Sequence, residues 1–127
     1  MPALLPYTVA PGPPTILHVC SRDLIRELRD RIFSVHGYHV TSTLSISEAE
    51  ELFAKSNFDL VLIDVDGDGR IPQAEKFCQE IKHLKPDQKI AFICNYRVSR
   101  YSTCPDEIIH SEFNPEALIE GVKEALE

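Results

Sequence analysis

The sequence predicts an α/β domain, in which a five-stranded parallel sheet lies between two layers of helices. Short apolar segments alternate with segments of helical periodicity along residues 15–127, and such alternation is typical of parallel sheets with right-handed crossovers. The segment FDLVLID, residues 58–64, is almost entirely apolar, as expected for a central strand covered on both faces. The chain length of 127 residues suits one domain with its own core.

The first strand and the first helix are predicted within residues 15–37. TILHVC, residues 15–20, is a short apolar run typical of a buried strand. The helix is predicted over 22–37, with Ser21 as its N-cap and Gly37 as its stop. Apolar side chains that recur on one helical face, and are therefore expected to be buried, are Leu24, Ile25, Leu28, Ile32 and Val35.

The second strand and the second helix follow. Residues 38–44 (YHVTSTL) are rich in β-formers and predict a more exposed strand. Ser47 and Glu50 have the spacing of a capping box, which predicts a helix over 48–56. The apolar run at 58–64 is then the third strand, and Asp64 is at its carboxyl end.

The second half of the chain continues the alternation, with one irregularity. Residues 96–106 show no clean helical pattern, so the fourth helix is expected to be short or irregular. Asn114 as N-cap and Pro115 at the first helical position predict where the last helix begins. The remaining predicted elements are a helix over 73–85 with Phe77, Ile81 and Leu84 buried, strands over 89–95 and 107–112, and a final helix over 116–126.

Composition and charge exclude several classes of protein. The net charge of −7 argues against a general nucleic-acid or anionic-membrane binder, because phosphate contacts need a basic surface. No apolar run has the length of a membrane span. Residues 1–14 are interpreted as a flexible Pro-rich arm rather than a signal peptide, since they lack a basic start. A cytoplasmic protein is therefore expected. Four arginines, interpreted as a solvated helix face, are Arg22, Arg26, Arg29 and Arg31.

The four cysteines are predicted to be reduced thiols. Cys20, Cys78, Cys94 and Cys104 are irregularly spaced, without a C-x-x-C pair, which argues against a zinc site. Without an export signal, reduced cytosolic thiols are expected. Cys20 and Cys94 both end strands, so a redox or soft-metal pocket is one hypothesis. Buried small hydrophobic residues are the favoured interpretation.

The stretch IDVDGDGRIPQAE, residues 63–75, contains a calcium-loop pattern. Acidic residues and a glycine fall at the spacing D-x-D-x-D-G-x5-E. An EF-hand needs a helix before the loop, whereas the preceding run favours a strand, and the chain has no second such loop. A Ca²⁺- or Mg²⁺-responsive module therefore remains an alternative of another class. Its metal ligands would be Asp64, Asp66, Asp68 and Glu75.

Residues 15–127 resemble the receiver domain of bacterial two-component response regulators. The segments that carry the resemblance are TILHVCSRDLIRELRDRIFSVHGYHV, FDLVLIDV and EFNPEALIEGVKEAL. The resemblance implies a flavodoxin-like, CheY-like three-layer sandwich with the strand order 2-1-3-4-5. It also implies that Asp64 occupies the position of the aspartate that accepts a phosphoryl group in a phosphorelay.

The rest of the family's phosphorylation pocket is missing. The resemblance places the Mg²⁺-binding acidic pair at Cys20 and Ser21, and the hydroxyl that binds the phosphoryl group at Cys94. It places the conserved lysine at Ser111, followed by Glu112 where the family has proline. The aromatic position falls on Ile108. Without these groups, Mg²⁺ is expected to bind weakly and Asp64 to be phosphorylated slowly or not at all. Asp23 is the nearest carboxylate that could replace one of the missing pair.

The resulting hypothesis is a non-enzymatic pseudo-receiver in two-component signalling. It would act through protein–protein interaction, on the face formed by the last strand and the last helix. The partner would be a histidine kinase or a downstream effector, and the chain would be a monomer or a weak homodimer. A conventional phosphoacceptor receiver, phosphorylated on Asp64, is the alternative within the same fold.

Overall fold

A computed structural model describes residues 12–99, 101–111 and 114–127 of the chain. The predicted arm therefore falls largely outside the described residues, as does Glu112. The element order is β1-α1-β2-α2-β3-α3-β4-β5-α4, with one turn of 3-10 helix, Asp68–Arg70, between β3 and α3.

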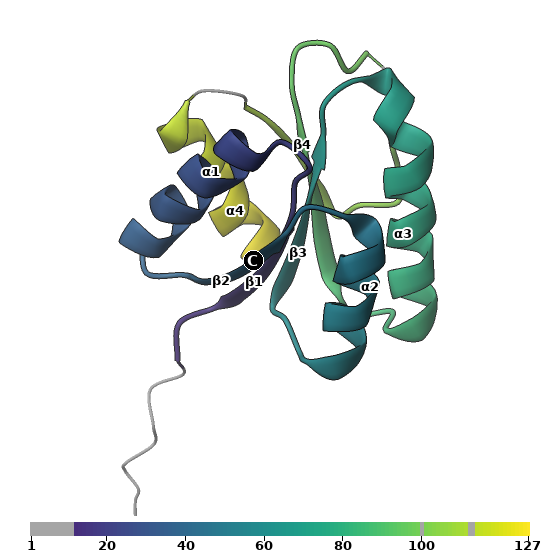
Figure 1. The fold of residues 1–127 in the computed structure, drawn as a ribbon, viewed down its shortest axis with the longest axis horizontal. Helices are drawn as coiled ribbons and strands as arrows, with labels where there is room; N and C mark the ends of the chain where they lie inside the picture. Colours follow the sequence, from purple (N-terminus) through teal and green to yellow (C-terminus); the bar gives the residue numbers. More distant parts are fainter. Residues whose placement is uncertain (1–11, 100, 112–113) are drawn as a thin grey trace, which may run out of the picture.

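The five strands form one parallel sheet in the order β2-β1-β3-β4-β5, as predicted. β3 is central and fully flanked, which explains why its sequence is a continuous apolar run. Figure 1 shows the sheet edge-on between two layers of helices. The strands are β1 Thr15–Val19, β2 His39–Thr43, β3 Leu60–Val65, β4 Lys89–Cys94 and β5 Glu107–His110.

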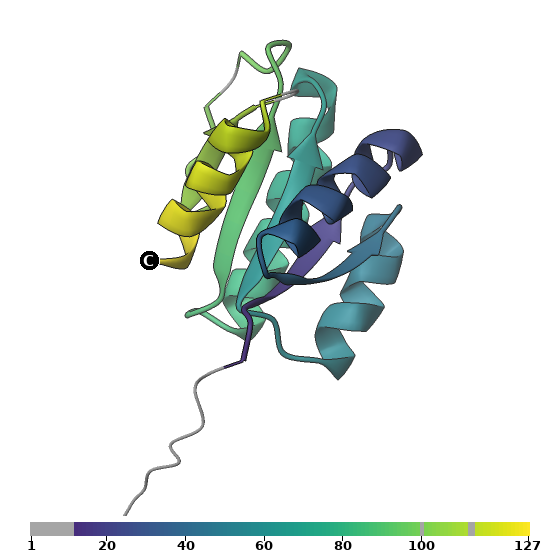
Figure 2. The same ribbon diagram turned by 90° about the vertical axis from the view of Figure 1, so that its left-hand side faces the viewer.

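Two helices cover each face of the sheet. α1 (Asp23–Val35) and α4 (Pro115–Leu126) lie together on one face, which is turned toward the viewer in Figure 2. α2 (Ile46–Lys55) and α3 (Ile71–Leu84) cover the other face. Between β4 and β5 the described residues contain no helix, in agreement with the prediction for 96–106. None of the described helices combines the length and the apolar character needed to cross a membrane.

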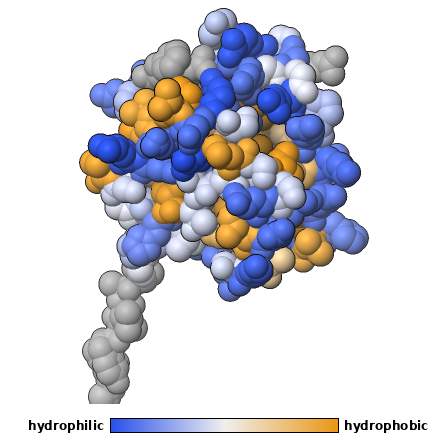
Figure 3. Space-filling model, viewed as in Figure 1, coloured by the Kyte–Doolittle hydropathy of each residue, from blue (hydrophilic) through white to orange (hydrophobic). Residues whose placement is uncertain are grey.

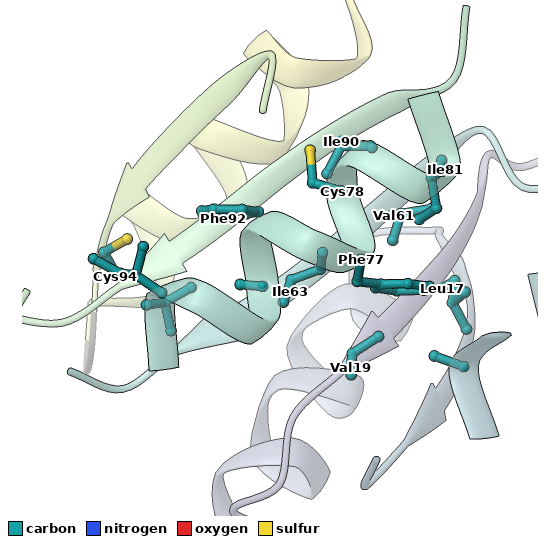
Figure 4. Close-up of a cluster of buried hydrophobic side chains, with 14 of the residues drawn as sticks. Leu17, Val19, Val61, Ile63, Phe77, Cys78, Ile81, Ile90, Phe92 and Cys94 are labelled. Carbon is teal, nitrogen blue, oxygen red and sulfur yellow. The ribbon is translucent and has the colours of Figure 1, made fainter. Parts of the chain in front are cut away.

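The alternation of side chains along the strands divides the core into two clusters. On the α2/α3 face, Val61 and Ile63 of β3 pack with Phe77 and Ile81 of α3 (Figure 4). On the α1/α4 face, Leu60 and Leu62 pack with Phe33 of α1 and with residues of α4. Asp64 is the next residue of β3 that points to the same face as Leu60 and Leu62. Its side chain is therefore directed toward α1.

Two predicted helix caps need correction. α2 begins at Ile46, and its N-cap is Ser45, whose side chain accepts a hydrogen bond from the Glu48 amide. Ser45 and Glu48 have the same capping-box spacing as the predicted Ser47 and Glu50, so periodicity alone could not select between them. α1 begins at Asp23 after Arg22, without a side-chain cap. Ser21 is therefore not its N-cap. Asn114 does cap α4, as predicted.

The predicted buried face of α1 is correct only in part: Ile25 and Ile32 are half-buried, and Ile32 packs against the α1/α4 core, whereas Leu28 is exposed. Leu24 and Val35 are 81% and 83% exposed, and the fully buried residues of this helix are Arg29 and Phe33. Leu84, predicted as core, is likewise exposed at the end of α3. The buried side of α1 contains the charged residue Arg29, so the apolar stripe coincides with the buried surface only in part.

A disulfide joins Cys78 on α3 to Cys104 in the segment between β4 and β5. The Cα atoms of the two residues are 6.4 Å apart, which is within the range that a disulfide bridges. The prediction of four reduced thiols is thus wrong for this pair, because irregular sequence spacing does not reveal which side chains meet in space. Cys20 and Cys94 are free and buried.

The disulfide is expected to stabilise the fold measurably. It closes a loop with a sequence separation of 26 residues, so reduction should lower the free energy of unfolding by about 2–4 kcal/mol. Urea unfolding of the wild-type chain with and without a dithiol reductant measures this change. The Cys104→Ser variant should start at the lower stability and should not respond further to reductant. An unchanged wild-type midpoint under reductant would contradict the stabilising role.

Candidate functional site

The candidate site lies at the carboxyl ends of the central strands. In parallel α/β sheets this edge is where functional groups gather. Val19 of β1 is in register with Ile63 of β3, so Cys20 follows next to Asp64. Ile93 of β4 is in register with Asp64 on its other side.

The Asp64 carboxylate is bound by two arginines from the α1 region. Arg22 is bidentate: its Nη2 donates to Oδ1 at 2.9 Å and its Nε to Oδ2 at 3.1 Å. Arg29 Nη1 donates to Oδ1 at 2.8 Å. The side chains of Asp64 and Arg29 are each only 3% exposed. Both carboxylate oxygens are therefore occupied by charge-assisted hydrogen bonds in a largely water-excluded setting.

These arginines determine the protonation state of Asp64. Burial by itself would raise the pKa of the Asp64 carboxyl, but the hydrogen bond from Arg22 and the charge of Arg29 outweigh it, and the net pKa is lowered. Asp64 is thus an ionised carboxylate whose charge is compensated from within the chain.

The acidic residues after Asp64 have other partners. Asp66 lies 3.6 Å from Arg22 Nε and 3.8 Å from Arg97 Nη2. Asp68 accepts hydrogen bonds from the amide and the hydroxyl of Ser99, at 2.8 and 2.6 Å. These contacts hold the loop after β3 to the segment after β4.

The pocket positions named from the resemblance are spread over this edge. Cys20 Sγ lies 3.8 Å from Arg29 Nη1, whereas Ser21 is exposed. The Ser111 hydroxyl donates to the carbonyl of Asn114. Ile108 is half-buried and packs against the α2/α3 core. None of these residues supplies an acid, a hydroxyl or an ammonium group to Asp64.

Cys20 and Cys94 do not form a common pocket. Cys94 belongs to the α2/α3 core, whereas Cys20 contacts arginines of the α1 region. The hypothesis of a shared redox or soft-metal site is therefore not supported. Burial, with a smaller contribution from the Asp64 charge, raises the pKa of each thiol to about 11. Both are protonated near neutral pH.

The predicted metal ligands are not brought together. Within the described residues, no three or more His, Cys, Asp or Glu side chains are grouped so that they could hold a metal ion. Asp64 is paired with arginines, Asp68 with Ser99, and Glu75 lies on α3. A strand precedes the loop, and α3 begins at Ile71 within the calcium-loop pattern. Two guanidinium groups at Asp64 also repel a divalent cation, so these residues do not fit Mg²⁺ or Ca²⁺.

The arginines are what the sequence interpretation missed. They were assigned to a solvated face, yet Arg29 is buried and Arg22 is largely covered. Two signals could have located them. Arg22 and Arg29 are seven residues apart and so share one helical face. In addition, a buried aspartate that lacks the family's metal ion and lysine requires another positive charge beside it.

Comparison with known proteins supports the receiver resemblance. No protein-family model matches the chain, and no curated protein matches it. Among solved structures, the chain is similar to the response regulator TrrA of Thermotoga maritima in complex with Mg²⁺-BeF. The TM-score is 0.76 at 29% sequence identity, over 88% of this chain and 98% of that chain.

Two further structures extend the comparison. TrrA in complex with the histidine kinase ThkA has a TM-score of 0.76 at 29% identity, over 90% of this chain and 99% of that chain. A CheY-like receiver domain protein from Methanospirillum hungatei has a TM-score of 0.74 at 21% identity, over 91% of this chain and 94% of that chain. The structural neighbours of the chain are thus response-regulator receiver domains, and its strand order is theirs.

The buried pair of Arg29 and Asp64 should be costly to break. Arg29→Met leaves Asp64 with one cation instead of two, and is expected to lower the free energy of unfolding by about 3–5 kcal/mol. Adding Asp64→Asn should recover much of this loss, because the uncompensated charge is removed. Arg31→Met, at an exposed arginine of the same helix, is the matched control and should change stability by less than about 0.5 kcal/mol. Urea unfolding of the wild type, Arg29→Met, Asp64→Asn and the double variant measures the coupling, and purely additive effects would contradict the pairing.

Proposed function

We propose that the chain is a single-domain, receiver-like protein of two-component signalling that works without phosphorylation at Asp64. The observation that carries this proposal is the occupation of both Asp64 oxygens by Arg22 and Arg29. In this proposal the arginines take over the charge compensation that a receiver obtains from its metal and its lysine. The domain is thus a pseudo-receiver with a built-in cation pair.

Phosphorylation at Asp64 is disfavoured for two physical reasons. A carboxylate oxygen must attack the phosphorus, and both oxygens are held by guanidinium donors with the side chain 3% exposed. Phosphoryl transfer also depends on positioning and on neutralisation of charge by metal ions, and the two arginines oppose the binding of a divalent cation beside Asp64. The conventional phosphoacceptor and the Ca²⁺- or Mg²⁺-responsive module are therefore the weaker alternatives.

The proposed activity is binding of a protein partner. TrrA, which is 29% identical to this chain, was solved in complex with the histidine kinase ThkA, and this supports a kinase or a downstream effector as the class of partner. A non-enzymatic role follows from the proposal, since a domain of this kind would signal through contact alone.

The exposed apolar residues favour α1 as the docking side. Leu24, Leu28 and Val35 are exposed along this helix, and they lie on one stripe because they are four and seven residues apart. Figure 3 shows separate hydrophobic patches among hydrophilic residues, including the side where Figure 1 places α1 and α4. β5 and α4 carry none of the large exposed hydrophobic side chains found in the described residues. We therefore propose the α1 stripe in place of the face of the last strand and helix.

Incubation with a small-molecule phosphodonor and Mg²⁺, followed by intact-mass measurement, tests the proposed function. The wild-type chain should gain no phosphoryl group at Asp64 under conditions that phosphorylate a conventional receiver domain used as the positive control. The matched variant is Asp64→Asn, which should give the same mass profile as the wild type. A gain of one phosphoryl group in the wild type that is lost in Asp64→Asn would overturn the proposal.

A further inference from the structure

A groove runs between α2 and α3, on the face of the sheet opposite α1. It consists of two adjoining hollows with volumes of about 590 and 370 Å³, and residues of these two helices alone line both of them. The hollows share Glu50, Lys76, Phe77 and Glu80. The groove is therefore continuous along the two helices, and its shape suits a linear occupant better than a compact one.

The larger hollow has an apolar wall. Phe77, Ile81 and Leu84 lie on one side of α3, because they are four and seven residues apart, and Phe53 contributes from α2. Leu84 is 73% exposed and Phe53 is only partly buried. Figure 3 shows hydrophobic residues among hydrophilic ones on the side where Figure 1 places α2 and α3. The groove thus offers apolar surface that a partner can bury.

Two carboxylates meet where the hollows join. Glu50 of α2 and Glu80 of α3 are exposed, and both line both hollows. The hydrogen bond with Glu80 is the main reason that the pKa of the Glu50 carboxyl is raised, and the opposing charge of Lys76 does not outweigh it. A further cation at this point would be attracted by both carboxylates. The groove therefore favours a positive charge that is flanked by apolar groups.

We propose that the α2/α3 groove binds an amphipathic helix of a protein partner that carries an arginine or lysine between apolar side chains on one face. The apolar side chains would pack against Phe53, Ile81 and Leu84, and the cation would lie between Glu50 and Glu80. A helix laid in an apolar groove is a recurring mode of recognition. A side-chain cation fits better than a metal ion, since the described residues contain no group of three or more metal-ligating side chains.

The groove is a second docking surface. It lies on the opposite face of the sheet from the α1 stripe and involves neither Asp64 nor its arginines. The inference therefore goes beyond the proposed function and does not depend on it.

A methyl-detected NMR titration of the full chain with synthetic peptides tests the proposal. The probe is an alanine-based helical peptide with one arginine between leucines on a single face, and its counterparts carry glutamine or glutamate in place of the arginine. The methyl signals of Ile81 and Leu84 should shift, while those of Ile16 and Leu24 on the α1 side should not. Affinity should fall from arginine to glutamine to glutamate, by about twofold to fivefold at each step.

A scrambled peptide of the same composition and charge controls for attraction to the negative net charge of the chain. At the same ionic strength it should bind about tenfold more weakly or worse, because its leucines no longer share one face.

Variants separate the apolar wall from the charge. Leu84→Ala, at an exposed position, should weaken binding of the arginine peptide about threefold or more. The double variant Glu50→Gln/Glu80→Gln should lose the preference for arginine over glutamine. Glu51→Gln, at an exposed acid of α2 that does not line the groove, is the matched control and should keep that preference.

Three results would overturn the proposal. They are equal affinity for the scrambled peptide, retention of the arginine preference in the double variant, and shifts at Leu24 in place of Ile81 and Leu84. The last result would leave docking at the α1 stripe intact, and a phosphoryl group gained at Asp64 would leave the groove intact, so the two proposals fail separately.

Discussion

The ion pair between Asp64 and the two arginines of the α1 region is the constraint on which the rest of this structure depends. Asp64 is directed to the α1 side by the alternation of β3, where a lone carboxylate would be expensive to bury. Arg29 compensates this charge from the buried face of α1. Arg22, in the turn after β1, also donates to the carboxylate. The position of α1 on the sheet, the low pKa of Asp64 and the exposure of the apolar stripe follow from this one arrangement.

Charge compensation links the architecture to the proposed function. In the receiver family that the chain resembles, part of the positive charge beside this aspartate comes from a bound metal ion. Here the positive charge is carried by arginine side chains of the domain itself. The pocket therefore has one electrostatic state near neutral pH. In the proposed function, partner binding through the α1 stripe would then be constitutive. The disulfide from α3 to the segment between β4 and β5 fixes a region that has no helix among its described residues.

Much of the fold could be predicted from the sequence, because strand patterning and the order of elements are local properties. The apolar run before Asp64 correctly predicted β3. The Asn114-Pro115 pair correctly predicted the start of α4. The predictions that were wrong depend on contacts between distant residues. Arg29 was assigned to solvent because its partner lies 35 residues away, and Cys78 and Cys104 meet only in three dimensions. The departures from the receiver pattern at Cys20, Ser21, Cys94 and Ser111 were recognised in the sequence, whereas the pairing of Arg22 and Arg29 with Asp64 was not.

Direct measurement of the Asp64 pKa tests the central claim most sharply. Carbon-detected NMR of the side-chain carboxyl, followed from neutral pH to the onset of acid unfolding, reports the protonation of this residue alone. If Arg22 and Arg29 hold the carboxylate, the pKa of Asp64 lies below the usual value of 3.8. Burial without the arginines would have the opposite effect. A pKa at or above 3.8 would show that the ion pair does not form and would contradict this account.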